Sequence, residues 1–363
     1  MSATDRQRYA ARIRAMAVAG PLSRLRGWGG VAAMALACVL TAAFALLPLH
    51  HVSEAPSGTG SQGVADARQA LAPAAPACDE AQPDASLRAR DIDDGPKIEE
   101  IRGRTDKPKN KLVVGIDQNS YLWGYRNPNN GNLEGFDIDL ATAIAKAIFG
   151  TYTDDSGDEK VNIVFRAVPT NQRIPMIKSG QVDMIVRTMT ISCKRKADVA
   201  FSTAYFATGQ QVLAPDNSKI TGFDASLENK KLCVAAGSTA QGALEDKDYG
   251  ADTPLVVPNQ LDCLVRLQLG EVDGVVTDSA LAAGQAAQDP TVELKGDPLA
   301  TEYYGIAMSK DPKAEDLVRR VNHELDQWRK DPAGWKKSYA KWLAVPLGDP
   351  DAKAKPPAPN YSD

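Results

Sequence analysis

Short apolar runs alternate with helix-forming segments through most of this 363-residue chain, and this alternation limits the fold more than any other feature. The run Lys111-Leu-Val-Val-Gly-Ile116 is apolar after its first residue, as expected for a strand buried on both faces of a parallel sheet. Parallel strands need crossover connections, so the alternation predicts an α/β fold with doubly wound sheets. Further strands are expected at 161–167, 182–186, 232–236, 255–257 and 272–276, and helices at 141–149, 172–178, 241–247 and 262–269. The stretch 313–343 should form two helices separated by Asp331-Pro-Ala-Gly334.

One sequence pattern occurs twice and indicates two similar lobes. Ile177-Lys-Ser-Gly-Gln-Val-Asp-Met-Ile185 and Leu267-Gln-Leu-Gly-Glu-Val-Asp-Gly-Val275 share a helix end, a glycine, a polar residue, Val-Asp and an apolar pair. Because glycine commonly follows a helix, ordinary loop chemistry is an alternative explanation. The polar residues after both strands favour two lobes that face one cleft, formed by 109–206 with 300–345 and by 207–299.

The first 49 residues have the pattern of a membrane signal. Residues 1–26 hold six arginines against one acid, Asp5, and the stretch 28–49 contains an uncharged apolar run long enough to span a membrane. Arginines on one side place that side in the cytoplasm and the rest of the chain outside. We expect a basic cytoplasmic arm at 1–27 and an uncleaved, single-pass transmembrane anchor at 28–49. A cleaved signal peptide and a lipid anchor at Cys38 are the alternatives.

Two segments have compositions that do not suit a hydrophobic core. Residues 50–108 are rich in Ala and Pro, and residues 346–363 contain Asp-Pro-Asp and Lys-Pro-Pro-Ala-Pro. We expect the first to be a disordered tether and the second a disordered tail. The net charge of −4 provides no basic footprint for nucleic acid, and we expect a monomer.

The cysteines indicate disulfide bonds. Of the five, Cys38 lies in the expected span, and an even number remains on the oxidising side of the membrane. Three pairings are open; we favour Cys233–Cys263, whose partners fall in one lobe, together with Cys78–Cys193. Neither a CxxC motif nor a histidine cluster accompanies the cysteines, so we expect no metal site and no cofactor.

The region from Gly180 to Arg195 gives the strongest indication of function. A short apolar strand there opens into the polar loop Thr188-Met-Thr-Ile-Ser-Cys-Lys-Arg195, which offers hydroxyls, backbone N–H groups and a guanidinium. Such donors can satisfy both oxygens of a carboxylate. A second donor pattern, Gly237-Ser-Thr239, and a lone acid after a strand, Asp278, complete the set. Carboxylate donors together with an acid that can neutralise an ammonium indicate α-amino-acid binding.

A series of motifs in fixed order supports this interpretation. The motifs are Lys111-Leu-Val-Val-Gly-Ile-Asp117, Gly135-Phe-Asp-Ile-Asp-Leu-Ala141, Asn171-Gln-Arg-Ile-Pro175, Gly180-Gln-Val-Asp183, Thr188-Met-Thr-Ile-Ser192 with Arg195, Phe201-Ser-Thr-Ala-Tyr-Phe206 and Gly237-Ser-Thr239. Over residues 109–345 the series resembles the bacterial extracellular solute-binding proteins of family 3, and most of all the glutamine- and glutamate-binding members of polar-amino-acid ABC transporters. No single motif is specific. The resemblance implies a two-lobed α/β fold of the type II periplasmic-binding-protein, or Venus-flytrap, class.

The resemblance also implies roles for particular residues that hold the backbone atoms of an amino acid. They are Arg195 for the carboxylate, Thr188 and Thr190 for both ends, Ser238 and Thr239 as carboxylate donors of the second lobe, and Asp278 for the α-ammonium. Each has a structural alternative. The arginine could be solvated, the threonines could make ordinary loop hydrogen bonds, and the residues at helix starts could be capping groups.

The ligand's side chain would meet a second group of residues. Asp117 matches a position where amide-selecting relatives carry Asp, whereas Arg173 resembles the arginine with which acid-selecting relatives bind a side-chain carboxylate. The sequence therefore mixes two patterns. If Asp117 and Arg173 pair, a polar ligand with either an amide or a carboxylate could be accommodated. Glutamate or aspartate is favoured slightly over glutamine or asparagine. Further contacts are expected from Thr170, Gln260, Tyr121 and Trp123, although the aromatic residues suit the core equally well.

The expected mechanism is capture of an amino acid by closure of the two lobes. Two chain crossings, near 204–210 and 298–303, should act as hinges. The partner would be an ABC permease in the cytoplasmic membrane; the alternative is a sensor that signals to a membrane regulatory protein. A more remote alternative is an enzyme like the cyclohexadienyl dehydratases of this family. That chemistry needs a general acid in the cleft, and the sequence offers no unassigned candidate, so we expect no enzymatic activity.

Overall fold

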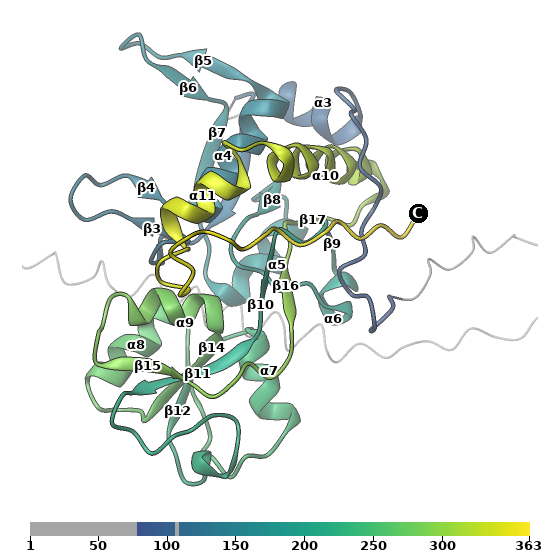
Figure 1. Cartoon of the computed structure of the whole chain (residues 1–363). Helices are drawn as coiled ribbons and strands as arrows, with labels where there is room; N and C mark the ends of the chain where they lie inside the picture. Colours follow the sequence, from purple (N-terminus) through teal and green to yellow (C-terminus); the bar gives the residue numbers. More distant parts are fainter. Residues whose placement is uncertain (1–77, 106–108) are drawn as a thin grey trace, which may run out of the picture. The chain divides into compact units, whose positions relative to one another are not determined.

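The computed structural model describes residues 78–105 and 109–363 and contains two five-stranded sheets (Figure 1). The first has the order β7 (Ile163–Ala167), β1 (Leu112–Ile116), β8 (Met184–Ile185), β17 (Ala307–Ser309) and β9 (Val199–Phe201). The second has the order β13 (Leu255–Val257), β12 (Leu232–Ala235), β14 (Gly274–Asp278), β11 (Gln210–Pro215) and β15 (Val292–Lys295). Each sheet is the centre of one lobe, which confirms the two-lobed α/β fold.

Helices cover both sheets, as the alternating sequence predicts. On lobe 1 these are α3 (Pro96–Arg102), α4 (Phe136–Phe149), α5 (Arg173–Lys178), α6 (Cys193–Lys196), α10 (Glu315–Lys330) and α11 (Trp335–Trp342). On lobe 2 they are α7 (Thr239–Asp246), α8 (Gln260–Gln268) and α9 (Ser279–Ala286). Small antiparallel sheets extend lobe 1: β2 (Asn119–Ser120) with β3 (Gly124–Arg126) and β4 (Leu133–Glu134), and β5 (Thr151–Thr153) with β6 (Glu159–Val161). None of the helices in the described residues is long and apolar enough to cross a membrane, and the expected anchor at 28–49 lies outside those residues.

The order of the strands follows from their hydrophobicity. All five residues of β1 are buried, and the strand pairs in parallel with β7 on one side and with β8 on the other. In lobe 2, β12 is likewise buried and pairs in parallel with β13 and β14. Central parallel strands are covered by helices on both faces, which is why their sequences read as continuous apolar runs.

Two short strands connect the lobes. β10 (Phe206–Thr208) and β16 (Glu302–Tyr304) form an antiparallel pair in which Phe206 is opposite Tyr304 and Thr208 is opposite Glu302. In Figure 1 they run side by side between the upper and the lower lobe. Their positions agree with the two expected crossings.

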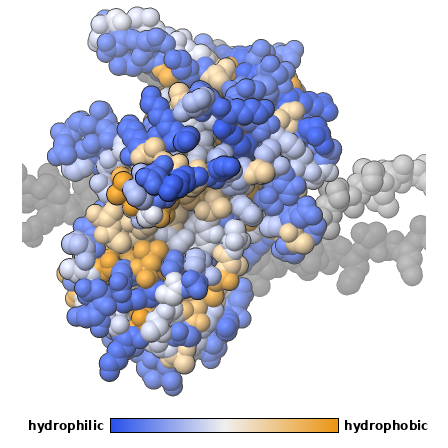
Figure 2. Space-filling model, in the orientation of Figure 1, coloured by the Kyte–Doolittle hydropathy of each residue, from blue (hydrophilic) through white to orange (hydrophobic). Residues whose placement is uncertain are grey.

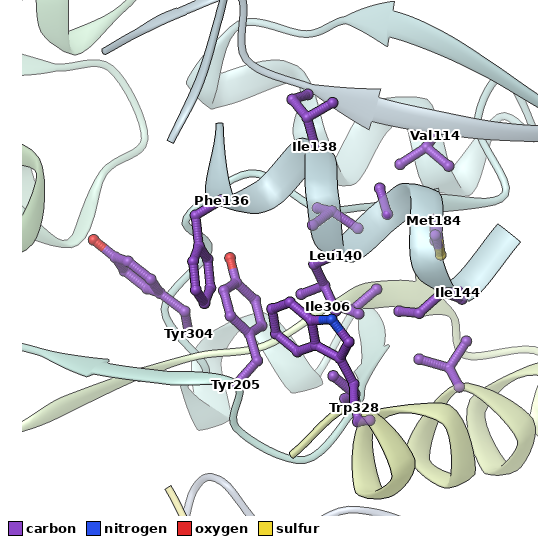
Figure 3. Packing of buried hydrophobic residues seen from close by; sticks show 14 of the residues in the cluster. Val114, Phe136, Ile138, Leu140, Ile144, Met184, Tyr205, Tyr304, Ile306 and Trp328 are labelled. Atoms are coloured by element: carbon purple, nitrogen blue, oxygen red, sulfur yellow. The ribbon is translucent and has the colours of Figure 1, made fainter. Parts of the chain in front are cut away.

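An aromatic cluster fills the core of lobe 1 beside this connection. Trp123 has no exposed surface, and its ring meets those of Phe136, Phe206 and Tyr304 edge-on. Figure 3 shows Phe136, Tyr205, Tyr304 and Trp328 grouped around the start of α4. Large aromatic side chains in contact contribute both buried area and preferred edge-to-face geometry. This core therefore stabilises the lobe and fixes the strands that lead to the other lobe.

The expectation of disorder is wrong for part of the tether and for the tail. Within 50–108, residues 96–102 form α3, whose Ile98 and Ile101 are fully buried against α10. Within 346–363, Ala352 is buried, and the Tyr361 hydroxyl donates to Asp326 at 2.7 Å. The composition of these segments was a misleading guide to disorder. A segment needs few apolar residues to become ordered when it packs on a surface that the rest of the fold provides.

Both expected disulfides are present. Cys78 is bonded to Cys193 in α6, with their Cα atoms 5.4 Å apart. Cys233 in β12 is bonded to Cys263 in α8, with their Cα atoms 5.5 Å apart. The second bond lies inside lobe 2, whereas the first attaches residues before α3 to the turn that contains Arg195.

The surface supports the division into two lobes. Figure 2 shows a largely hydrophilic face, with apolar residues gathered near the junction of the lobes and on the lower lobe. Exposed apolar side chains of lobe 2 include Leu255, Val256, Val265 and Leu269. Within the single compact unit that the described residues form, the two lobes are in contact, and several side chains between them are buried.

The buried position of α3 leads to a test of its contribution. We expect Ile101→Ala to lower the free energy of unfolding by about 2–5 kcal/mol, because a fully buried branched side chain is lost and a cavity remains. Glu100→Ala, one residue away and mostly exposed, should change it by about 0.5 kcal/mol or less. Urea denaturation of both variants measures the difference; equal effects would mean that α3 is not part of the core.

Candidate ligand-binding site

The expected site residues come together where strands of both lobes end. Asp117 follows β1, Thr188 to Arg195 follow β8, and Asp278 is the last residue of β14. Loops at the carboxyl ends of parallel strands are the usual place for ligands in α/β folds. The side chains gathered there are all buried or nearly so: Asp117, Thr170, Arg173, Thr188, Thr190, Arg195, Gln260 and Asp278. The cleft is therefore closed around a set of charged groups.

Arg195 extends from lobe 1 to lobe 2. It lies in the single turn of α6, where the Ser192 hydroxyl caps the helix by accepting from the Arg195 backbone N–H. Its Nη1 donates to the Thr190 carbonyl at 2.7 Å and its Nη2 to the Gly237 carbonyl at 3.2 Å. Burial lowers the pKa of Arg195, and the charges of Asp278 and Glu302 oppose this effect. The guanidinium is thus held in the cleft and is not a solvated surface charge.

Asp117 pairs with Arg187 and not with Arg173, so the condition under which the site would accommodate an amide and a carboxylate equally is not met. The Arg187 Nη2 lies 2.8 Å from Asp117 Oδ2, and the Arg187 side chain has no exposed surface. Arg187 also donates to the Thr170 hydroxyl at 3.0 Å and, across the cleft, to Asn259 Oδ1 at 3.2 Å. Sequence reasoning missed Arg187. A cation directly after the apolar run of β8 was nevertheless a usable signal, since an arginine buried at that position needs an acid nearby.

Arg173 is left without an acidic partner among the described residues. Its Nε donates to the Thr170 carbonyl at 2.9 Å and its Nη1 to the Arg187 carbonyl at 3.2 Å. Only 3% of the residue is exposed. Burial, and then the positive charges of Arg195 and Arg187, lower the pKa of Arg173 well below its ordinary value. A buried cation whose hydrogen-bond partners are neutral carbonyls lacks a compensating negative charge nearby.

Asp278 is the acid of lobe 2. Tyr304 donates to its Oδ2 at 2.6 Å, and the amide of Gln210 donates to its Oδ1. Burial, and next the negative charge of Glu302, raise the pKa of Asp278 to about 6. The residue occupies the N-cap position of α9, but its side chain makes no capping hydrogen bond. Its carboxylate is directed to the cleft.

The hydroxyl groups of the expected site have different partners. Those of Thr190 and Thr239 both donate to Glu302 Oε2, at 2.9 and 3.2 Å. Ser238 caps α7 by accepting from the Gln241 N–H at 3.1 Å, so the capping alternative is correct for its side chain. Glu302 was not among the expected residues, because the local sequence indicates only the start of a crossing strand there.

Thr188 has an unusual backbone conformation. Its φ of 39° lies in the left-handed region, and its N–H donates to Asp137 Oδ2 at 3.0 Å. Its hydroxyl is buried without a hydrogen-bond partner among the described atoms. Asp137, which also accepts from Tyr205, holds this strained turn in place. Burial raises the pKa of Asp137 to about 7.

The remaining expected residues lie at the edge of the site or outside it. Thr170 and Gln260 contact each other across the lobes at 3.4 Å. Tyr121 lines a small cavity together with Gln260 and stacks edge-on against Tyr125. Trp123 belongs to the core and donates from Nε1 to the Ala280 carbonyl of lobe 2 at 3.1 Å. The role of Trp123 is therefore packing in the core and contact between the lobes, not a position over a ligand.

The raised pKa of Asp137 predicts a pH dependence of stability. Between pH 3.8, the ordinary pKa of an aspartate, and about pH 7, Asp137 is protonated in the folded state and ionised in the unfolded state. Its contribution to the free energy of unfolding therefore falls as pH rises through that window. The unfolding free energy of wild type relative to Asp137→Asn should therefore fall by up to about 4 kcal/mol between about pH 4 and about pH 8. Denaturant titrations at several pH values measure this difference; a constant difference would contradict the assignment.

Comparisons with known proteins agree with this geometry. The model of the family described as bacterial extracellular solute-binding proteins, family 3, matches residues 112–345. The ABC transporter glutamine-binding protein GlnH of Bacillus subtilis is 35% identical over 65% of this chain and 82% of its own length. The glutamate-binding protein GluB of Corynebacterium efficiens is 28% identical over 66% of this chain and 79% of its own. The solved structure of an ancestral arginine-binding protein bound to glutamine has a TM-score of 0.57 and 33% identity, covering 64% of this chain and 97% of that one. The chain belongs to the bacterial extracellular solute-binding proteins of family 3.

Proposed function

We propose that this protein captures glutamate or aspartate outside the cell and delivers it to an ABC permease. The observation that carries the choice of an acidic ligand is the unpaired, buried guanidinium of Arg173. Membership of the family, and relatives that are named as glutamine- and glutamate-binding proteins, support an amino acid as the ligand. Because the family and these relatives are solute-binding proteins, the protein is not an enzyme.

The groups at one end of the cleft suit the zwitterionic part of an amino acid. Arg195 of lobe 1 provides a guanidinium, which can bind a carboxylate with two hydrogen bonds. Asp278 of lobe 2 provides the opposite charge for an ammonium. A ligand that binds both residues bridges the two lobes and therefore favours the closed arrangement, because its contacts with both are made only when the lobes meet.

The groups at the other end favour an acidic side chain. Asp117 is already neutralised by Arg187 at 2.8 Å, so it does not balance the charge of Arg173. A side-chain carboxylate would supply the missing negative charge. The carbonyl of a glutamine side chain would accept a hydrogen bond there but would leave the buried charge uncompensated, which is costly. Arg173 therefore favours glutamate or aspartate over the corresponding amides.

Delivery requires a membrane partner and a location outside the cell. The relative named as an ABC transporter glutamine-binding protein supports a permease as that partner. We place the protein at the cell membrane, anchored by the apolar stretch 28–49, with the folded lobes outside. The crossing strands β10 and β16 would act as the hinge when the permease receives the closed form.

The two charged groups at the zwitterion end are the first test. Arg195→Met and Asp278→Asn should each weaken glutamate binding by about 30-fold or more, because each leaves one ligand charge buried and unpaired. In wild type, affinity should also weaken as pH falls below about 6, because Asp278 must be deprotonated to bind an ammonium. Isothermal titration calorimetry of the full-length protein measures both effects. Wild-type affinity in both variants would refute this placement of the zwitterion.

Arg173 provides the test of selectivity. Arg173→Met should weaken glutamate or aspartate binding by about 30-fold or more, because the side-chain carboxylate loses its cation, and should change glutamine binding by about threefold or less. Arg166→Met, an exposed arginine on β7, is the matched control and should change neither. A thermal-shift screen against the common amino acids comes first. A clear wild-type preference for an amide would contradict the choice of an acidic ligand.

A further inference from the structure

Glu302 connects both lobes at the zwitterion end of the cleft. It begins the crossing strand β16 and is opposite Thr208 of β10. Its Oε2 accepts from the hydroxyl of Thr190 in lobe 1 at 2.9 Å and from the hydroxyl of Thr239 in lobe 2 at 3.2 Å. The side-chain amide of Gln210 donates to the same oxygen at 3.1 Å. One carboxylate oxygen therefore has a hydrogen-bond donor from each lobe and another from the strand that follows β10.

A count of protons shows what this arrangement does to the two threonines. A hydroxyl has a single proton to donate and two lone pairs that accept. The protons of Thr190 and Thr239 are both directed to Glu302, so these hydroxyls have none left for another acceptor. Toward any further group they present lone pairs. They cannot donate to a ligand carboxylate without releasing Glu302.

Acceptors directed into the cleft suit an ammonium group. An ammonium has three protons, and each needs an acceptor when water is excluded. Thr190, Thr239 and Asp278 all belong to one hydrogen-bonded set. The Gln210 NH2 group lies 2.9 Å from Thr239 Oγ1 and within hydrogen-bond distance of Asp278 and Glu302, and its two protons are shared among these three acceptors. The carbonyl oxygen of the Gln210 amide is itself buried without a partner among the described atoms and is a further acceptor.

We propose that Glu302 is a positioning residue for the ligand's α-ammonium. It holds the hydroxyls of Thr190 and Thr239 as acceptors and adds a second negative charge beside Asp278. The inference rests on the proposed function and deepens it, because it makes this end of the cleft selective for an amino group. The ligand's carboxylate is then left to Arg195 and to the backbone N–H groups at the start of α7.

The electrostatics of the neighbouring groups agree with this role. The charge of Glu302 helps to raise the pKa of Asp278 to about 6, as expected for two acids that share one small region. Arg195 partly balances the two acids, and an ammonium would balance them further. A ligand carboxylate at the position of the ammonium would meet two like charges and two hydroxyls that offer no protons.

The test is a double-mutant cycle in the full-length protein with glutamate as the probe, measured by calorimetry. Glu302→Gln removes the negative charge beside Asp278 and replaces one of the two acceptor oxygens by an NH2 group, and it should weaken binding by about tenfold or more. Thr190→Val alone should also weaken binding. In the Thr190→Val background Glu302→Gln should cost about threefold or less, because part of its effect acts through that hydroxyl. Glu302→Asp should recover part of the affinity, and Glu293→Gln, an exposed glutamate on β15, should have no effect.

A second measurement identifies which end of the ligand Glu302 serves. Glutarate has both carboxylates of glutamate and no ammonium. Competition of glutarate against bound glutamate measures, for each variant, how much more tightly glutamate binds than glutarate. Glu302→Gln should reduce this ratio of affinities by about tenfold. Tighter glutamate binding by Glu302→Gln would show that Glu302 competes with the ligand's carboxylate. Fully additive effects of Glu302→Gln and Thr190→Val on the binding free energy would show that Glu302 does not act through Thr190. Either result overturns the inference while leaving the proposed function intact, whereas a wild type that binds no acidic amino acid overturns the ligand assignment itself.

Discussion

The ion pair of Asp117 with Arg187 is the contact on which the arrangement of the binding region depends. A guanidinium with no exposed surface is stable only when an acid and further acceptors surround it, and here these come from the end of β1, from Thr170 and from Asn259 of the other lobe. Because Asp117 is paired with Arg187, it is not available to pair with Arg173. Arg173 is therefore left with carbonyl partners alone, and the positive charges of Arg195 and Arg187 act on it. The selectivity proposed for the site follows from this one pairing.

Core and site share residues, so the stability of the lobe and the geometry of the cleft are linked. Tyr304 packs against Trp123 and Phe206, and the same residue donates to Asp278 through its hydroxyl. Tyr205 similarly packs against Phe136 and donates to Asp137, which holds the turn at Thr188. Rigid aromatic rings place two polar groups in the cleft at fixed distances from the core. Such support from packed residues is what keeps binding groups in position.

Sequence reasoning predicted the parallel strands of both sheets, both disulfides and most of the charged groups of the cleft, because each of these has a local signal. It did not predict the antiparallel strands β9, β11, β15 and β17. A continuous apolar run indicates a buried parallel strand, and an acid directly after such a run, as at Asp278, indicates the edge of the sheet where ligands bind. Arg187, Gln210, Glu302 and Tyr304 were missed. The roles of all four depend on partners far away in the sequence, as between Thr190 and Glu302. Arg187 had a local signal, a cation directly after the apolar run of β8, whereas Gln210, Glu302 and Tyr304 resemble ordinary strand residues. The helix at 96–102 and the ordered C-terminal residues were missed for the related reason that they are stabilised by a surface formed elsewhere in the chain.

The bond between Cys78 and Cys193 joins the chain before the first described helix to the turn that contains Arg195. Residues 79–192, including β1 and α4, form a covalently closed loop. Any tension on the chain from the N-terminal side of Cys78 consequently bypasses that loop and reaches α6 first, two residues from the guanidinium in the cleft. The lobe is thus mechanically attached at its binding turn, and the three sheet strands inside the loop, β1, β7 and β8, are shielded from the pull.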